Sequence, residues 1–114
     1  MVRLSTFAPT DAPRKYNPGA RPLAGAELQP LLNQLPDWKA SADGKQIERE
    51  FRFKNYYETV AFVNATAWIS NQQDHHPDIE LHYNRCLFRY STHMIGGLSR
   101  NDFICAARVD ALLE

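Results

Sequence analysis

The chain is 114 residues long, with 44% hydrophobic and 23% charged residues, which suits one globular domain. Thirteen basic side chains balance thirteen acidic ones, so overall charge argues against nucleic acid as a partner. No apolar run is long enough to cross a bilayer, and the first ten residues lack the apolar segment of a secretory signal. We therefore expect a cytoplasmic protein that does not act at a membrane.

The N-terminal stretch 1–22 differs from the rest of the chain in its proline content. Four prolines fall in it: Pro9, Pro13, Pro18 and Pro22. Prolines this dense prevent a regular helix and weaken any strand. We expect an irregular arm over 1–22, either a loosely packed extension or a partner-binding tail, followed by one folded domain over 23–114.

A short helix and a hairpin are predicted next. Four leucines follow the i, i+3, i+4, i+7 spacing of one helix face, and Pro36 ends the run: Leu28, Leu31, Leu32 and Leu35. Asp43-Gly44 between the runs 38–42 and 47–53 is a strong hairpin signal. Ile47, Phe51 and Phe53 share one strand face, but Arg49 interrupts it for no reason visible in the sequence.

A central helix is predicted over 56–73, because Asn55 can cap it and Glu58 stands three residues further on. We expect its apolar stripe to face the core. The stripe comprises Tyr57, Ala61, Ala65 and Trp68. Pro77 disfavours helical backbone at His76, so the helix should end near His75.

Two more strands and a last helix complete the chain. Alternation predicts a strand from Asp78, a turn at Asn84-Arg85 and a second strand through Thr92. Ser99 and Asp102 then form a capping pair for a helix to about Leu113. The fold class is therefore α+β, a four-stranded antiparallel sheet with helices on one face, in the order α-β-β-α-β-β-α.

Apolar placement also predicts the core. We expect seven aromatic side chains to be largely buried: Trp38, Phe51, Phe53, Phe62, Trp68, Phe88 and Phe103. Cys86 and Cys105 stand far apart in apolar surroundings, which favours buried, reduced cysteines, although the sequence also allows one disulfide.

Three histidines and several acids gather between Asp74 and Asp102. The run Asp74-His75-His76-Pro77 is followed after five residues by Tyr83-Asn84, after eight more by His93, and after eight more by Asp102. Histidine exchanges protons near neutral pH, and chain junctions can present such side chains to a ligand. This spaced set, with Phe51-Arg52-Phe53 before it and Gly96-Gly97-Leu98-Ser99 within it, resembles the pterin-4a-carbinolamine dehydratases over about residues 48–110.

The resemblance implies a reaction, namely loss of water from a 4a-hydroxytetrahydropterin to give the quinonoid dihydropterin. This step belongs to recycling of the tetrahydropterin (tetrahydrobiopterin) used by aromatic amino acid hydroxylases, and it needs neither a cofactor nor a metal. The resemblance makes His75, His76 and His93 the catalytic residues. We expect His75 and His93 to transfer protons and His76 to hold the ligand. The resemblance also implies substrate-binding positions at Asp74, Pro77, Tyr83, Thr92 and Asp102.

Each of these residues also has a purely structural interpretation. His75 could cap the central helix, Asp102 fits a capping role well, and Tyr83 could belong to the core. His82 stands outside the pattern and is expected at the surface. Only the joint spacing favours function for the three catalytic candidates.

Other functions remain open at this level. Asn71 and Ile79 replace an acid and a tryptophan that are usual in the family, which keeps a non-enzymatic binding protein, an assembly factor or coactivator, as the alternative. A zinc site built from His75, His76 and His93 is disfavoured, since adjacent histidines on extended backbone point apart. The resemblance and the exposed sheet edges together predict a homodimer or homotetramer.

Overall fold

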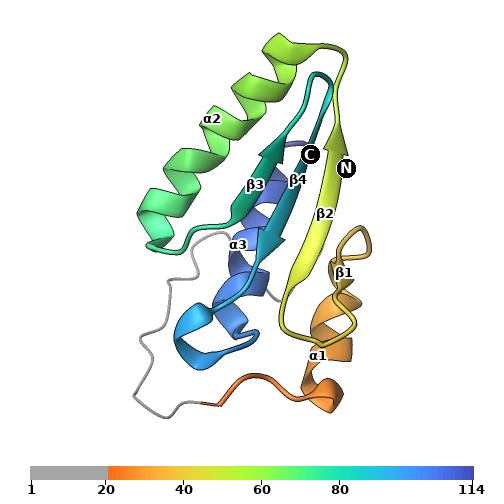
Figure 1. Ribbon diagram of the computed structural model, residues 1–114, viewed down its shortest axis with the longest axis vertical. Helices are drawn as coiled ribbons and strands as arrows, with labels where there is room; N and C mark the ends of the chain where they lie inside the picture. The colour runs from red at the N-terminus through yellow and green to blue at the C-terminus, as the bar shows by residue number, and fades with distance from the viewer. Residues whose placement is uncertain (1–20) are drawn as a thin grey trace.

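The computed structural model describes residues 21–114, so the predicted arm lies outside the described residues except for Arg21 and Pro22 (Figure 1). The elements are α1 (Gly25–Leu32), β1 (Lys39–Ala40), β2 (Ile47–Arg52), α2 (Tyr56–Gln73), β3 (Asp78–Leu81), β4 (Arg85–Tyr90), the 3-10 turn η1 (His93–Ile95) and α3 (Arg100–Ala111). This confirms the predicted class and the order of helices and strands.

The four strands form one antiparallel sheet in the order β1-β2-β4-β3, which leaves β1 and β3 at the edges. Helices α2 and α3 lie together against one face of this sheet (Figure 1). Side chains alternate along β4, so Cys86, Phe88 and Tyr90 face the helices and are fully buried. The predicted core is therefore confirmed for Trp38, Phe51, Phe62, Phe88 and Phe103, while Phe53 is half-buried.

The two predicted helix starts are confirmed by their hydrogen bonds. The Glu58 amide donates to Oδ1 of Asn55 over 2.9 Å at the start of α2, and the Ser99 amide donates to Oδ2 of Asp102 over 2.9 Å at the start of α3. The Asp43-Gly44 hairpin also forms, with Gly44 at a φ of 71°, a conformation that glycine adopts without strain. These local features needed only a few neighbouring residues to form.

One expectation about α2 is wrong. The helix buries Thr59, Phe62, Thr66, Ile69, Ser70 and Gln73 against the sheet and α3. The stripe expected in the core points outward instead, with Tyr57 81% and Trp68 65% exposed. Small hydroxyl-bearing side chains let the helix approach the sheet closely, whereas the bulky aromatic stripe would hold it away.

The structure explains why Arg49 interrupts an apolar strand face. Its guanidinium donates to Oδ1 of Asp110 over 2.7 Å and lies 4.3 Å from the centre of the Phe51 ring. Trp38 donates its Nε1–H to the same carboxylate over 2.9 Å. Asp110 is almost fully buried, and a buried carboxylate requires a cationic partner. Arg49 is that cation, which explains its place on an otherwise apolar strand face.

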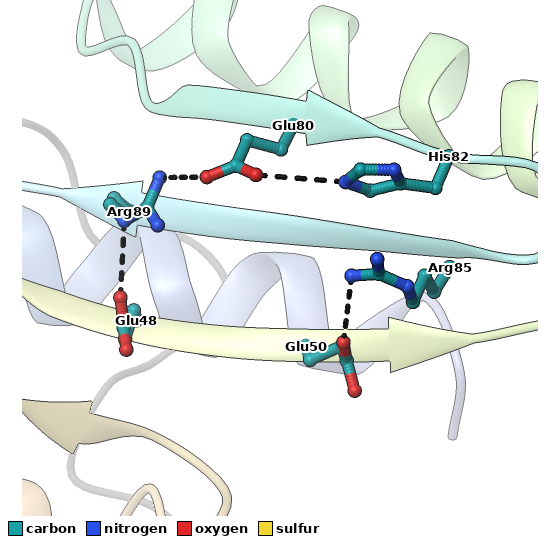
Figure 2. A network of polar contacts seen from close by, with 6 residues as sticks. All are labelled: Glu48, Glu50, Glu80, His82, Arg85 and Arg89. Atoms are coloured by element: carbon teal, nitrogen blue, oxygen red, sulfur yellow. Dashed lines mark hydrogen bonds and ion pairs between the residues drawn. The ribbon is translucent and has the colours of Figure 1, made fainter.

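The opposite face of the sheet is polar and carries a ladder of ion pairs (Figure 2). Arg89 on β4 bonds Glu48 on β2 and Glu80 on β3, and Arg85 bonds Glu50. His82 lies 3.6 Å from Glu80 and joins this surface network, in agreement with its expected surface role. Exposed pairs of this kind align strands and contribute little stability each.

Both cysteines are free and buried, as expected. Burial raises the pKa of the Cys86 thiol to about 11 and that of Cys105 to about 12, so both stay protonated near neutral pH. Within residues 21–114, no helix is long and apolar enough to span a bilayer.

Candidate functional site

The candidate site lies at the end of the sheet where α2 passes into β3 and where β4 ends. The register places Asp78, the first residue of β3, opposite Arg89, and Ile47, the first residue of β2, opposite Tyr90. The junction 74–77 and the segment 91–97 therefore leave the sheet at the same end (Figure 1). This confines the predicted histidines to one end of the domain.

A sharp bend at Asp74 directs the chain into the site. Asp74 ends α2 in the left-handed conformation, with φ 49° and ψ 44°, and its amide donates to the Ser70 and Asn71 carbonyls. Aspartate tolerates this conformation better than most residues, which is why the helix can stop here without glycine. The His75 amide donates to the Ser70 carbonyl over 3.1 Å. The bend therefore fixes the position of the His75 backbone, from which the imidazole side chain extends.

The His75 ring is held by Asp102 on α3. Its Nε2 lies 2.6 Å from Oδ1 of Asp102, and the two side chains are 11% and 0% exposed. Because a carboxylate can only accept a hydrogen bond, Nε2 carries the ring proton in this pair. The other nitrogen, Nδ1, makes no hydrogen bond to residues 21–114.

Among residues 21–114, the Asp102 carboxylate has three hydrogen-bond partners. Its Oδ2 accepts from the Thr92 hydroxyl over 2.8 Å and from the Ser99 amide over 2.9 Å, while Oδ1 serves His75. The Thr92 and Ser99 hydroxyls lie 2.7 Å apart. The sequence predicted the capping role of Asp102, and the structure shows that the same carboxylate also positions His75.

Tyr90 is a further contact that the sequence did not reveal. Its ring stacks on that of His75, with the centroids 6.0 Å apart and the planes 8° from parallel. Tyr90 is fully buried and the surrounding apolar core raises the pKa of its phenol well above the usual value. Alternation with Phe88 marked Tyr90 only as a core residue, and no sequence signal pointed to His75.

His93 follows Thr92 but faces outward. It is exposed and begins η1, while β4 ends at Tyr90 instead of continuing through Thr92 as predicted. It lines a pocket of about 540 Å³ between the segment 91–97 and the hairpin turn 41–46. His75 and His76 are not among the lining residues of that pocket. Thr92 therefore links two sides of the site, because it binds Asp102 inward and carries His93 outward.

The segment that carries His93 is tied to the start of the described chain. The Leu23 amide donates to the Leu98 carbonyl over 2.8 Å, and Thr92 pairs with Gly97 across the loop. A Cβ on Gly97 would lie 2.7 Å from Cβ of Pro22, so only glycine allows this close approach.

The other predicted binding residues are spread more widely. His76 is exposed beside the half-buried Pro77, and the Asp74 carboxylate makes no hydrogen bond to the described residues. Tyr83 lies in the turn between β3 and β4, at the far end of the sheet from the histidines, where it stacks on Tyr56. The chain thus brings His75, Thr92 and Asp102 into contact, but it does not bring Tyr83 to them.

A family comparison bears on this arrangement. Residues 21–112 match the family model described as pterin 4 alpha carbinolamine dehydratase. The chain belongs to this family. The matched range includes every residue of the candidate site, so the family pattern and the His75–Asp102 contact occupy the same segment.

Sequence relatives of the chain carry the name of the same family. A protein of Stenotrophomonas maltophilia, provisionally named as a pterin-4-alpha-carbinolamine dehydratase, is 56% identical over 81% of this chain and 79% of its own length. One of the same name from Nitrosomonas eutropha is 56% identical over 90% of this chain and 92% of its own.

Two solved structures share the fold. One, described as a transcriptional coactivator/pterin dehydratase from Brucella melitensis, has a TM-score of 0.78 and 26% identity, over 82% of this chain and all of its own. The other, a pterin dehydratase-like protein described as a RuBisCO assembly factor in the alpha-carboxysome, has a TM-score of 0.58 and 26% identity, over 67% of this chain and 88% of its own.

In residues 21–114, no group of three or more histidine, cysteine, aspartate or glutamate side chains is placed to hold a metal ion.

Proposed function

We propose that this protein dehydrates a 4a-hydroxytetrahydropterin to the quinonoid dihydropterin, using histidines as acid and base. The observation that carries the proposal is the contact between His75 and the buried carboxylate of Asp102, inside the family's matched segment. An imidazole whose tautomer and orientation are set by a buried acid is a prepared proton carrier.

The reaction needs two proton transfers that balance each other. The 4a-hydroxyl leaves as water once it has received a proton, and the neighbouring ring nitrogen gives one up as the double bond forms. His75, whose Nδ1 makes no hydrogen bond to residues 21–114, is suited to accept the proton from nitrogen. His93 is exposed at the lining of the pocket and is suited to protonate the hydroxyl. We assign the exposed His76 to holding the ligand, as the family resemblance implies.

The test is steady-state dehydration of a 4a-hydroxytetrahydropterin by wild type and a His93→Ala variant. Removing a positioned acid should lower turnover by about 10²-fold or more. His93 is exposed, so thermal melts should be nearly unchanged. His82→Ala, which removes a histidine from the surface network, is the matched control and should keep its turnover. Near-normal turnover in folded His93→Ala would overturn the assigned role of His93.

A second candidate function is a non-enzymatic binding role. The outward face of α2 favours it, since Tyr56, Tyr57 and Trp68 are 51%, 81% and 65% exposed on one helix. The two structural relatives described as a coactivator and as an assembly factor support the same reading. A folded wild type without dehydratase activity would favour this candidate over the enzyme.

We also propose that the protein forms a homodimer or homotetramer. Two apolar surfaces support this: the outward stripe of α2 and the edge strand β3, where Ile79 and Leu81 are 37% and 40% exposed. Ile79 and Leu81 pair with Phe88 and Cys86, so they lie on the core side of the sheet but beyond the cover of the helices. An open strand edge with apolar side chains is well suited to pair with a second copy.

A further inference from the structure

The pocket beside His93 has a second wall that lies outside the spaced set of histidines and acids between Asp74 and Asp102. Its volume is about 540 Å³, in the range of small-molecule sites. One wall is the segment that carries His93, and the other is the turn between β1 and β2. The lining residues are Ser41, Ala42, Asp43, Lys45, Gln46, Ser91, His93, Gly96 and Gly97.

The turn that forms this second wall is held in shape by its own hydrogen bonds. The Ser41 hydroxyl donates to Oδ1 of Asp43 over 2.6 Å, and the Lys45 amide donates to the same oxygen over 3.0 Å. The Gln46 amide donates to the Ser41 hydroxyl over 3.2 Å. These bonds use the Ser41 hydroxyl and Oδ1 of Asp43, so the wall is preformed rather than loose.

Two side chains of the turn can offer hydrogen bonds to a ligand in the pocket. Lys45 and Gln46 make no side-chain hydrogen bond within residues 21–114, although both line the pocket. The ammonium of Lys45 offers up to three donors, and the amide of Gln46 offers both donors and an acceptor. Together they can bind a group that carries hydroxyls.

The charge of the turn argues against an anionic ligand. The hydrogen bond from Ser41 lowers the pKa of Asp43, so this carboxylate is ionised at neutral pH. It stands beside the single cation of the turn, Lys45, and the two charges offset each other. A neutral hydroxylated group therefore suits this wall better than a phosphate or a carboxylate.

The pocket also adjoins the proposed chemistry. Its inner wall contains Ser91 and His93, which flank Thr92, and the Thr92 hydroxyl binds the carboxylate that holds His75. A pterin that reaches His93 therefore has the turn 41–46 across the pocket from the reacting ring. The part of the substrate that varies between pterins is the side chain on this bicyclic ring.

We propose that the β1–β2 turn forms the subsite for the hydroxylated side chain of the pterin, with Lys45 and Gln46 as specificity-determining residues. This inference rests on the proposed function. It makes the preferred substrate a 4a-hydroxytetrahydropterin whose side chain carries hydroxyls, as in the biopterin form, over one with a bare methyl group.

The experiment compares two substrates, 4a-hydroxytetrahydrobiopterin and its 6-methyl analogue, in wild type, Lys45→Met and Gln46→Met. We expect wild type to favour the biopterin form in kcat/KM, mainly through KM. Each variant should reduce that preference by about three- to tenfold, the usual worth of one hydrogen bond. Lys54→Met, an exposed lysine at the other end of β2, is the matched control and should keep the preference.

Two results would overturn the subsite. One is an unchanged ratio between the two substrates in both variants, and the other is an equal loss for both substrates. Failure of the proposed function looks different, because wild type would then turn over neither substrate. In that case, equilibrium binding of biopterin and 6-methylpterin to wild type and both variants decides the question. Equal affinity for the two ligands in wild type, or no binding of either, would reject the subsite.

Discussion

Helices α2 and α3 cover the same face of the sheet, but they use their residues differently. α3 buries eight of its twelve residues, among them the charged Asp102 and Asp110. α2 buries six of its eighteen, and four of those six are polar, while its large aromatic side chains point outward. α3 therefore supplies many buried side chains and the Asp102 carboxylate of the candidate site, whereas α2 supplies fewer buried side chains and an exposed aromatic surface.

Buried charge makes α3 the more sensitive helix, and Asp110 is its most sensitive point for stability. Asp110→Ala would leave the Trp38 Nε1–H without its acceptor and the Arg49 guanidinium with only the more distant carboxylate of Asp37, 3.6 Å away. We expect a loss of about 3 kcal/mol in the free energy of unfolding, measured by urea denaturation. Glu50→Ala, which breaks exposed ion pairs on the open sheet face, should cost less than about 1 kcal/mol. Equal losses in the free energy of unfolding for the two variants would contradict the expectation that the buried pair contributes more stability than the exposed pairs.

Asp102 should be the most sensitive point of α3 for catalysis. In Asp102→Asn, the amide oxygen is expected to stay where Thr92 and Ser99 donate, which turns the NH₂ group toward Nε2 of His75. The ring then has to move its proton to Nδ1, so it loses the proton acceptor. We expect turnover to fall by about 10²-fold.

Two measurements control the Asp102→Asn experiment. Asp78→Asn makes the same change at an exposed position of the same junction and should keep its turnover. Circular dichroism should show that the helices survive in both variants. Full turnover in folded Asp102→Asn would mean that the contact with His75 serves the fold alone.

The exposed face of α2 predicts an effect on assembly rather than on folding. Trp68→Lys should weaken association of copies by about tenfold or more, since buried tryptophans often dominate interfaces. Light scattering over a concentration series should show a lower mass, while the melting of the helices changes little. Leu113→Lys, half exposed outside α2, is the control and should keep the wild-type mass. A monomeric wild type at micromolar concentration would contradict the proposed oligomer.

The smallest predicted effect concerns the start of α2. Asn55→Ala removes the side-chain acceptor of the Glu58 amide and should cost about 1 kcal/mol in the free energy of unfolding. Asn64→Ala, at an exposed interior position of the same helix, should instead stabilise the protein by a few tenths of a kcal/mol. Urea denaturation of the two variants checks the sign, and a stabilising Asn55→Ala would show that the cap is dispensable.

Local sequence was sufficient wherever the deciding contacts span a few residues. Asn55 and Glu58, Ser99 and Asp102, and the Asp43-Gly44 turn each define an element through hydrogen bonds or backbone preferences within four residues. Alternation and helical spacing then predicted the strands, the order of the elements and most of the aromatic core. The spaced histidines and acids indicated the family that the comparisons show.

Only the tertiary structure decided which residues meet across the chain. The partner of Arg49 is Asp110, 61 residues away, and the partner of His75 is Asp102, 27 residues away. The rotation of α2, which buries Thr59 and Thr66 and exposes Trp68, likewise depends on how closely the helix can approach the sheet. Periodicity defines the faces of a helix, but packing against the sheet selects the face that is buried, because that choice depends on shapes contributed by distant residues.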